Sequence, residues 1–183
     1  MGVFFLHCKE RMTMNSIFDH IQPNLDILFV GFNPSIRSGE TGHHFANPTN
    51  RFWTILHKAG LTDRKYHPEE DHSLLQLGYG LTNIVERPTK AADEITKEEY
   101  AEGREILKEK IATYTPKIVC FVGKGVYQQY SGRKQVKWGK QEKSMVSGIM
   151  DFVAPSSSGL VRMKVDEVVA IYAELPKLLR TLK

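Results

Sequence analysis

The sequence predicts a single α/β domain of three layers, in which a mostly parallel central sheet carries helices on both faces. Short apolar runs alternate with longer segments whose apolar residues recur at helical spacing. This alternation favours parallel strands joined by crossover helices. Two apolar runs lead into short loops, which we name the N-terminal motif (residues 31–35) and the C-terminal motif (residues 155–162). Loops at the carboxyl ends of parallel strands line the ligand crevice, so both motifs are candidate site segments.

The first half of the chain is expected to contain two strands and two helices. The apolar run LDILFV stops at Gly31, which is the pattern of a buried strand. Apolar residues recur at helical spacing before Gly60, and Gly78 closes a second, shorter apolar segment. We therefore expect a strand at 25–30, a loop at 33–49, helices at 50–59 and 69–77, and a strand at 81–85.

The second half is expected to begin with the longest helix. Thr96, followed three residues later by Glu99, forms a capping box, and Thr115-Pro116 ends the helix. We expect a helix at 96–114, a strand at 118–122, a helix at 126–130, one or two strands within 144–154 with a turn at Ser147-Gly148, and a closing helix at 166–179 that is kinked or ended near Pro176.

Length and composition indicate one soluble globular domain. The 183 residues are 41% hydrophobic and 25% charged, which allows a substantial core. No apolar stretch approaches the roughly 18 residues that span a membrane. The apolar run near the start has no basic leader, so we expect no signal peptide. We expect residues 1–20 to form an N-terminal extension and residues 21–183 to form the domain.

The only two cysteines, Cys8 and Cys120, form no disulfide framework and cannot ligate an iron–sulfur cluster unaided. Cys120 lies in the run IVCFV and is expected to be a small core residue. We therefore expect the chain to work in the reducing cytosol.

The charge of the chain is unevenly distributed. The net charge is +4 and the pI is near 9.0, which permits binding to nucleic acid without requiring it. Residues 131–143 hold five basic residues against one glutamate, whereas residues 93–109 hold seven acidic residues against three basic ones. A polyanion would contact the first segment and avoid the second. Two solvated faces whose charges cancel would give the same pattern.

Asn33 in the N-terminal motif is a candidate catalytic residue. It follows a predicted strand, and Pro34 favours an extended conformation at Asn33. An asparagine held in this way can orient a water molecule through its carbonyl oxygen while it stays uncharged. The alternative is a structural turn, because Asn-Pro is a common turn pair, and these five residues alone favour it.

Phe45 is a candidate stacking residue, because an aromatic ring near the first strand can stack on a flat heterocycle. Packing in the core is the alternative.

The neighbouring His43 and His44 lack a cysteine or a carboxylate pair at ligand spacing, so we expect no metal site. The turn at residues 123–125 places Lys124 at a helix start, where it can contact a phosphate or simply form a structural turn.

Residues 159–162, Gly-Leu-Val-Arg, predict a short apolar probe. Gly159 allows a tight loop, and an exposed Leu160 at its tip would enter a base stack as a wedge. Arg162 could then bond the base left without its partner, or a phosphate. The alternative is that Leu160 caps the core beneath the last helix.

Together these segments resemble the mismatch-specific uracil/thymine DNA glycosylases, a branch of the uracil-DNA glycosylase superfamily. The two motifs are supported by residues 41–53, by 82–89 and by 137–141. The bacterial branch usually has Asn-Pro-Ser-Gly-Leu-Ser-Arg in the second motif. Here Ser156-Ser157 replace Asn-Pro and Val161 replaces a serine, while Ser35 replaces a glycine. The Pro-Ser-Ser-Ser run and the Gly-His-His triplet look like the thymine-DNA glycosylase branch.

The resemblance implies a uracil-DNA glycosylase-like fold and hydrolysis of the N-glycosidic bond of uracil or thymine mispaired with guanine. Asn33 would position the attacking water, and Phe45 would stack on the extruded base. Phe32 and Ser35 would complete the base-binding set, with backbone amides around Phe32 and Phe45 stabilising the leaving base. The motif holds no lysine nucleophile, so a monofunctional enzyme that leaves an abasic site is implied. No metal or organic cofactor is implied.

The resemblance also assigns the DNA contacts. Gly159, Leu160 and Arg162 would fill the duplex and hold the widowed guanine. The expected partner is double-stranded DNA with G·U or G·T mismatches, bound by a monomer in a bacterial-type cytoplasm at the nucleoid. Phosphate contacts are expected from Ser156, Ser158, Lys124, Lys137 and Lys140.

Two alternatives remain at this stage. One is a catalytically weak damage-binding protein of the same fold, because Ser35 and Val161 depart from the usual motifs. The other is a nucleotide hydrolase or transferase. It is disfavoured because the acidic residues that a Mg²⁺ site needs gather on the predicted long helix, away from the strand ends.

Overall fold

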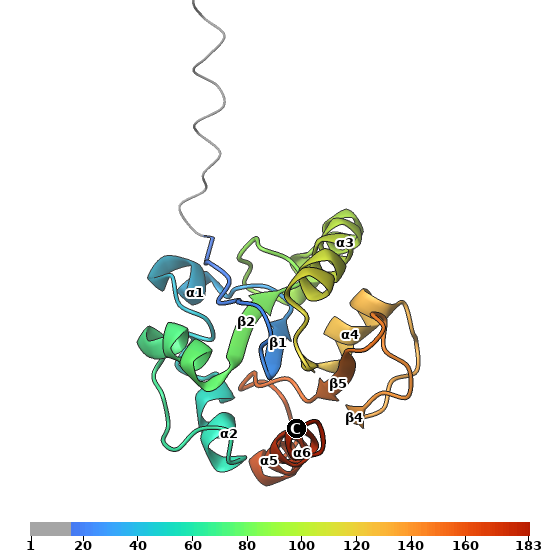
Figure 1. The fold of residues 1–183 in the computed structure, drawn as a ribbon. Coiled ribbons are helices and arrows are strands. Elements are labelled where there is room, and N and C mark those ends of the chain that lie inside the picture. Colours follow the sequence, from blue (N-terminus) through green and yellow to red (C-terminus); the bar gives the residue numbers. More distant parts are fainter. Residues whose placement is uncertain (1–15) are drawn as a thin grey trace, which may run out of the picture.

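The computed structural model describes residues 16–183, and the chain folds as predicted into one α/β domain (Figure 1). Most of the expected extension, residues 1–15, lies outside the described residues. No helix among residues 16–183 is long and apolar enough to cross a membrane. The elements are β1 (Ile27–Gly31), α1 (Ile36–Thr41), α2 (Phe52–Lys58), η1 (Pro68–Leu77), β2 (Tyr79–Asn83), η2 (Ala92–Glu94), α3 (Lys97–Tyr114), β3 (Ile118–Val122), α4 (Lys124–Ser131), β4 (Gly139–Lys140), β5 (Met150–Ala154), α5 (Val165–Tyr172) and α6 (Glu174–Thr181), where η denotes a 3-10 helix.

The central sheet has the strand order β2-β1-β3-β5-β4. The first four strands pair in parallel, and the short β4 pairs antiparallel with β5. From β1 the chain passes outward to β2 and then returns to place β3 on the other side of β1. This reversal leaves a crevice at the carboxyl ends of β1 and β3, where ligands bind in open α/β sheets.

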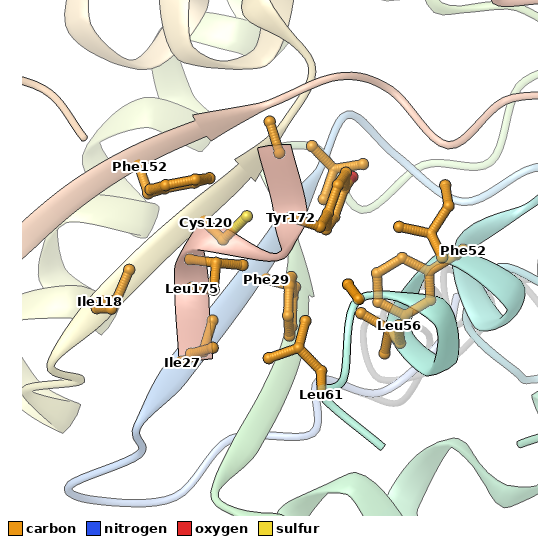
Figure 2. Close-up of a cluster of buried hydrophobic side chains, with 14 of the residues drawn as sticks. Ile27, Phe29, Phe52, Leu56, Leu61, Ile118, Cys120, Phe152, Tyr172 and Leu175 are labelled. Atoms are coloured by element: carbon orange, nitrogen blue, oxygen red, sulfur yellow. The ribbon is translucent and has the colours of Figure 1, made fainter. Parts of the chain in front are cut away.

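Alternating side chains of the strands build two cores, one on each face of the sheet. Ile27 and Phe29 of β1 belong to a cluster with residues of α2, α5 and α6 (Figure 2). Leu28 and Val30 of the same strand belong to a second cluster with residues of α3 and α4. Figure 1 shows the corresponding layers, with α3 and α4 on one side of the sheet and α2, α5 and α6 on the other. The period-2 alternation of a strand thus produces a sheet that is buried on both faces.

The strand at 118–122 and the capping box of the long helix are confirmed. Thr96 Oγ1 accepts from the Glu99 amide, and the Glu99 carboxylate accepts from the Thr96 amide. The expected strand at 81–85 instead begins at Tyr79 and ends at Asn83. After β2 ends, the amides of Ile84 and Val85 still donate to the carbonyls of residues 31 and 32. The chain therefore stays hydrogen-bonded to the end of β1 and to the residue that follows it, although Ile84 and Val85 are not part of the strand.

One further expectation was wrong, and two were confirmed: the closing helix breaks near Pro176, and the stretch 144–154 holds one strand after a turn at Ser147-Gly148. The expected loop at 33–49 contains α1, because the Ser35 side chain caps its first turn and Gly42 closes it at a φ of 77°. The closing helix is divided at Ala173, ahead of Pro176. A proline ring clashes with the carbonyl four residues earlier, here that of Tyr172, where α5 ends. Only residues 150–154 of the stretch 144–154 form a strand, and its antiparallel partner is residues 139–140.

Gly103 on α3 sets how closely this helix approaches the segment that follows β2. A Cβ atom built there would lie 1.9 Å from the Ile84 carbonyl oxygen. We predict that Gly103→Ala lowers the free energy of unfolding by about 1–3 kcal/mol, because helix and backbone must separate. Chemical denaturation measures the loss. The exposed neighbour Glu102→Ala is the control, and equal stability of the two variants would contradict this close approach.

Candidate active site

A cavity of about 200 Å³ opens at the carboxyl ends of the parallel strands. All four parallel strands contribute to its wall. The N-terminal motif begins at the last residue of β1 and lines the cavity throughout, Asn83 ends β2, Val122 ends β3, and residues 156–158 follow β5. The two motifs, more than 120 residues apart in sequence, therefore meet at one site. No Asp or Glu from residues 16–183 lines this cavity.

The Asn33 side chain is held in one orientation. Its Nδ2 donates to the Arg87 carbonyl at 2.7 Å and to Thr89 Oγ1 at 2.8 Å. Thr89 Oγ1 gives its own proton to the Ala91 carbonyl at 2.7 Å, so towards Asn33 it can only accept. Both partners therefore require the amide nitrogen of Asn33. The Oδ1 atom receives no hydrogen bond from residues 16–183, which leaves it available to an incoming donor.

Phe45 forms a flat wall of the cavity. Its ring stacks on Phe52 with the centroids 3.9 Å apart and the planes inclined by 13°. The backbone at Phe45 has a φ of 50°, and its carbonyl accepts from Trp53 Nε1 at 3.2 Å. One face of the ring is thus covered by Phe52 while the residue lines the cavity. This arrangement leaves a surface on which a planar ligand can stack.

The floor of the cavity depends on the absence of a side chain at Gly31. A Cβ atom there would lie 2.6 Å from Asn83 Oδ1 and 3.8 Å from the Phe45 ring. The Phe32 ring packs on the α4 side, where a Cβ at Gly125 would approach it to 2.6 Å, and it meets Tyr100 edge-on. Glycine at residue 31 therefore lets Asn83 and Phe45 approach each other across the end of β1.

Ser35 lines the cavity, but its hydroxyl also has a structural role. Its Oγ accepts from the Ser38 amide at 3.0 Å as the N-cap of α1. Ser38 Oγ, in turn, accepts from the Ala46 amide at 3.1 Å. The capped helix therefore ties the N-terminal motif to the segment that carries Phe45.

Hydrogen bonds from Arg51 hold the C-terminal motif in place. The Arg51 guanidinium donates to the carbonyls of Ser158 at 3.2 Å and Val161 at 3.4 Å, and the Arg51 amide donates to the Ser157 carbonyl at 2.8 Å. A Cβ at Gly159 would lie 2.6 Å from the Thr49 carbonyl oxygen, so the two loops are in close contact.

The tip of this loop projects into solvent. Leu160 is 93% exposed, which rules out the alternative that it caps the core beneath the last helix. Arg162 is exposed as well. Ser156 and Ser158 line the cavity, and their hydroxyls accept from the amides of Ser158 and Leu160. The loop thus joins the cavity wall directly to an exposed apolar side chain.

The basic segment 131–143 lies between α4 and β5. Lys137 and Lys140 are exposed to solvent. The Lys124 ammonium lies 4.3 Å from the centroid of the Trp138 ring, so the lysine at the start of α4 is directed towards this segment. The positive charges predicted for phosphate contacts therefore belong to one part of the surface.

His43 and His44 are held by a buried carboxylate. Asp71 accepts from the His44 amide at 2.8 Å, and His20 Nε2 lies 3.1 Å from it. Burial alone would raise the pKa of Asp71, but bonds from the His20 side chain and the His44 amide lower it to about 2. Burial lowers the pKa of His44, whose Nε2 donates to the Phe18 carbonyl at 2.8 Å. No group of three or more potential metal ligands occurs within residues 16–183.

Cys120 is fully buried in β3, and burial raises the pKa of its thiol. The thiol therefore stays protonated and packs in the core, as expected from the sequence.

Sequence reasoning assigned no role to three residues that shape the site. Asn83 and Thr89 lie in the segment 82–89, and both line the cavity. Asn83 lies inside the strand expected at 81–85, so its local sequence gave no signal that it would end β2 at the cavity. Arg51 precedes a helix, and nothing in its local sequence indicates that it bonds a loop 107 residues away.

Comparison with known proteins agrees with this geometry. The solution NMR structure of a "putative Uracil DNA glycosylase" from Methanosarcina acetivorans has the same fold, with a TM-score of 0.56 and 22% sequence identity over 89% of this chain and 98% of that chain. The family model described as the uracil DNA glycosylase superfamily matches residues 18–178. With this match over most of its length and with both motifs on one cavity, the chain belongs to the uracil DNA glycosylase superfamily.

Proposed function

We propose that this protein is a monofunctional DNA glycosylase that removes uracil or thymine mispaired with guanine and leaves an abasic site. The observation that carries the proposal is the free Oδ1 of Asn33, oriented by Thr89 in a cavity that also holds the Phe45 ring. The same cavity is continuous with the loop that exposes Leu160. A pocket for a flat base beside a protruding leucine suits an enzyme that extrudes a nucleotide from a duplex.

The extruded base would be held by stacking and by its polar edge. Stacking of a base on an aromatic ring is worth about 1–3 kcal/mol, and Phe52 already supports the Phe45 ring from behind. The Asn83 amide, beside Gly31 on the cavity floor, is suited to a hydrogen bond with the polar edge of a pyrimidine. Extrusion costs a few kcal/mol and least for a mismatched base, which favours mispaired uracil and thymine.

Asn33 Oδ1 would accept a hydrogen bond from the attacking water. The water oxygen forms a bond to C1′ of the deoxyribose, the N-glycosidic bond breaks, and its electron pair leaves with the base. The water loses a proton to bulk water, and the pyrimidine anion is stabilised by backbone N–H groups near Phe32 and Phe45. A neutral amide is a poor proton acceptor, so Asn33 activates the water only weakly. The reaction therefore depends on a pyrimidine that leaves the sugar largely without help.

Leu160 and Arg162 would act on the duplex. Leu160 would occupy the space vacated by the extruded nucleotide, and Arg162 would bond the unpaired guanine. Ser156 and Ser158 at the cavity wall, with Lys124, Lys137 and Lys140, are the proposed phosphate contacts. We further propose that the chain acts as a monomer in the cytoplasm.

A Mg²⁺-dependent nucleotide hydrolase or transferase finds no support, because residues 16–183 contribute no carboxylate to the cavity. A damage-binding protein without efficient chemistry remains as an experimental outcome. Incubation with a labelled G·U duplex, followed by alkaline cleavage of abasic sites, separates the two. Strand breaks support the glycosylase, whereas retarded mobility without breaks supports the binding protein.

Asn33→Ala is predicted to lower single-turnover cleavage of a G·U duplex by about 100-fold or more, because the water loses its acceptor. Duplex affinity should stay within about threefold of the wild type. Thr89→Val keeps Asn33 but removes one acceptor of its Nδ2, and should lower cleavage by about tenfold. Unchanged cleavage by Asn33→Ala would remove this residue from the mechanism. The exposed Gln76→Ala, far from the cavity wall, serves as the control.

Leu160→Ala is predicted to reduce processing of a G·T duplex by about tenfold, because the vacated space in the stack stays empty. Processing of uracil in single-stranded DNA should change by less than about twofold, since no stack has to be filled. Leu182→Ala, at an exposed leucine near the chain end, is the matched control. Equal losses on the two substrates would show that Leu160 is not a wedge.

The salt dependence of duplex affinity tests the basic segment. The double variant Lys137→Ala/Lys140→Ala should reduce the slope of log affinity against log salt by about 2. The variant loses two phosphate contacts, so its binding releases fewer counterions than binding of the wild type. Lys97→Ala/Lys108→Ala removes the same charge from α3 and should leave the slope unchanged. If both pairs alter the slope equally, the basic segment makes no specific contact with DNA.

A further inference from the structure

Two large apolar side chains within residues 16–183 are more than half exposed. One is Leu160 at 93% and the other is Phe18 at 84%. Leu160 belongs to the C-terminal motif, whereas Phe18 lies outside both motifs and has no role in the proposed reaction. A fully displayed phenylalanine presents a large apolar area to water, which makes it a candidate contact surface.

Hydrogen bonds fix the backbone from Phe18 to His20. The Phe18 carbonyl accepts from His44 Nε2 at 2.8 Å. Asp19 accepts from Thr82 Oγ1 at 2.7 Å and from Lys110 Nζ at 2.6 Å. His20 exchanges two backbone hydrogen bonds with Leu81 of β2, at 2.8 and 2.9 Å. The ring is therefore held out from an anchored backbone, and its exposure is a defined feature of the surface.

Phe18 lies at the rim of the cavity. Its neighbour Ile17 lines the cavity, and so does His44, which bonds the Phe18 carbonyl. Residues 16–20 run beside α1 and β2 (Figure 1), whereas the loop that leads to Leu160 leaves β5, which is separated from β2 by β1 and β3. The two exposed side chains thus flank the cavity from opposite sides.

The charges around Phe18 suit a polyanion. Asp19 is paired with Lys110, which also lies 3.9 Å from the exposed Glu86, and Asp71 is surrounded by His20 and His43. Lys90 lines the same cavity and is exposed. An aromatic face beside a cavity that is lined by Lys90 and by no carboxylate from residues 16–183 fits the chemistry of nucleic acid, in which bases stack and phosphates carry the charge.

We propose that Phe18 is a second DNA-contacting side chain, which stacks on a nucleotide next to the extruded one while Leu160 enters the duplex from the other side. This inference rests on the proposed glycosylase function. It predicts that flanking nucleotides on the target strand contribute to affinity through stacking. It also predicts that this contribution survives high salt better than the phosphate contacts do, because stacking releases no counterions.

The test uses the full chain in the Asn33→Ala background, which binds substrate without consuming it. Phe18→Ala should weaken binding to a G·U duplex by about tenfold at moderate salt, and Phe18→Trp should restore it. A 2-aminopurine placed beside the target uridine reports stacking directly, and its fluorescence change on binding should be lost in Phe18→Ala. Ile106→Ala is the matched control, because this α3 side chain is 41% exposed and outside the cavity wall.

The outcomes separate the two proposals. If the protein with native Asn33 cleaves the G·U duplex but Phe18→Ala binds it as well as its parent does, with the same 2-aminopurine signal, the inference about Phe18 is overturned while the function stands. If the protein neither binds nor cleaves the duplex, the proposed function fails and the inference fails with it. If Phe18→Ala instead abolishes self-association in sedimentation and leaves DNA binding unchanged, the ring contacts a second copy of the chain and the DNA contact is rejected.

Discussion

The candidate site depends on the parallel pairing of β1 with β2 and β3. In-register hydrogen bonds place Gly31 beside Asn83 and bring the ends of all four parallel strands to one edge of the sheet. Apolar residues on both faces of β1 lock this register, because a slip by one residue would exchange the two cores. The distances among Asn33, Phe45 and the C-terminal motif are therefore consequences of how the sheet packs.

The sequence predicted those parts of the fold whose stability is local. β3 was predicted with its observed bounds because it is a fully buried β-branched run, and α3 because Thr96 and Glu99 cap it reciprocally. The helix α1 was missed because it is short and half of its residues, Ser38, Gly39 and Thr41, are poor helix formers, whereas Ser35 and the Ser38–Ala46 contact stabilise it from outside. The pairing of β4 with β5 joins segments across a long loop, which no local pattern reveals.

The candidate site, too, was predicted only where its residues carry a local sequence signal. The sequence identified Asn33 and the two motifs because they follow apolar runs, and it identified Phe45 through the resemblance to a known family. The orientation of Asn33 depends on Arg87 and Thr89, which are 54 and 56 residues away. Hydrogen bonds of that range carry no periodicity or spacing signal. The position of Phe18 was equally hidden, because residues 1–20 were expected to form an extension, whereas Phe18 and His20 are hydrogen-bonded to the domain.

Arg51 couples the two loops of the candidate site. It directly precedes Phe52, the ring that supports Phe45, and its guanidinium donates hydrogen bonds to the carbonyls of Ser158 and Val161. The stacking platform and the leucine-tipped loop are therefore connected through both the side chain and the backbone amide of Arg51. A displacement of the leucine-tipped loop would therefore be transmitted to the helix start that carries Phe52 and, through it, to the Phe45 ring.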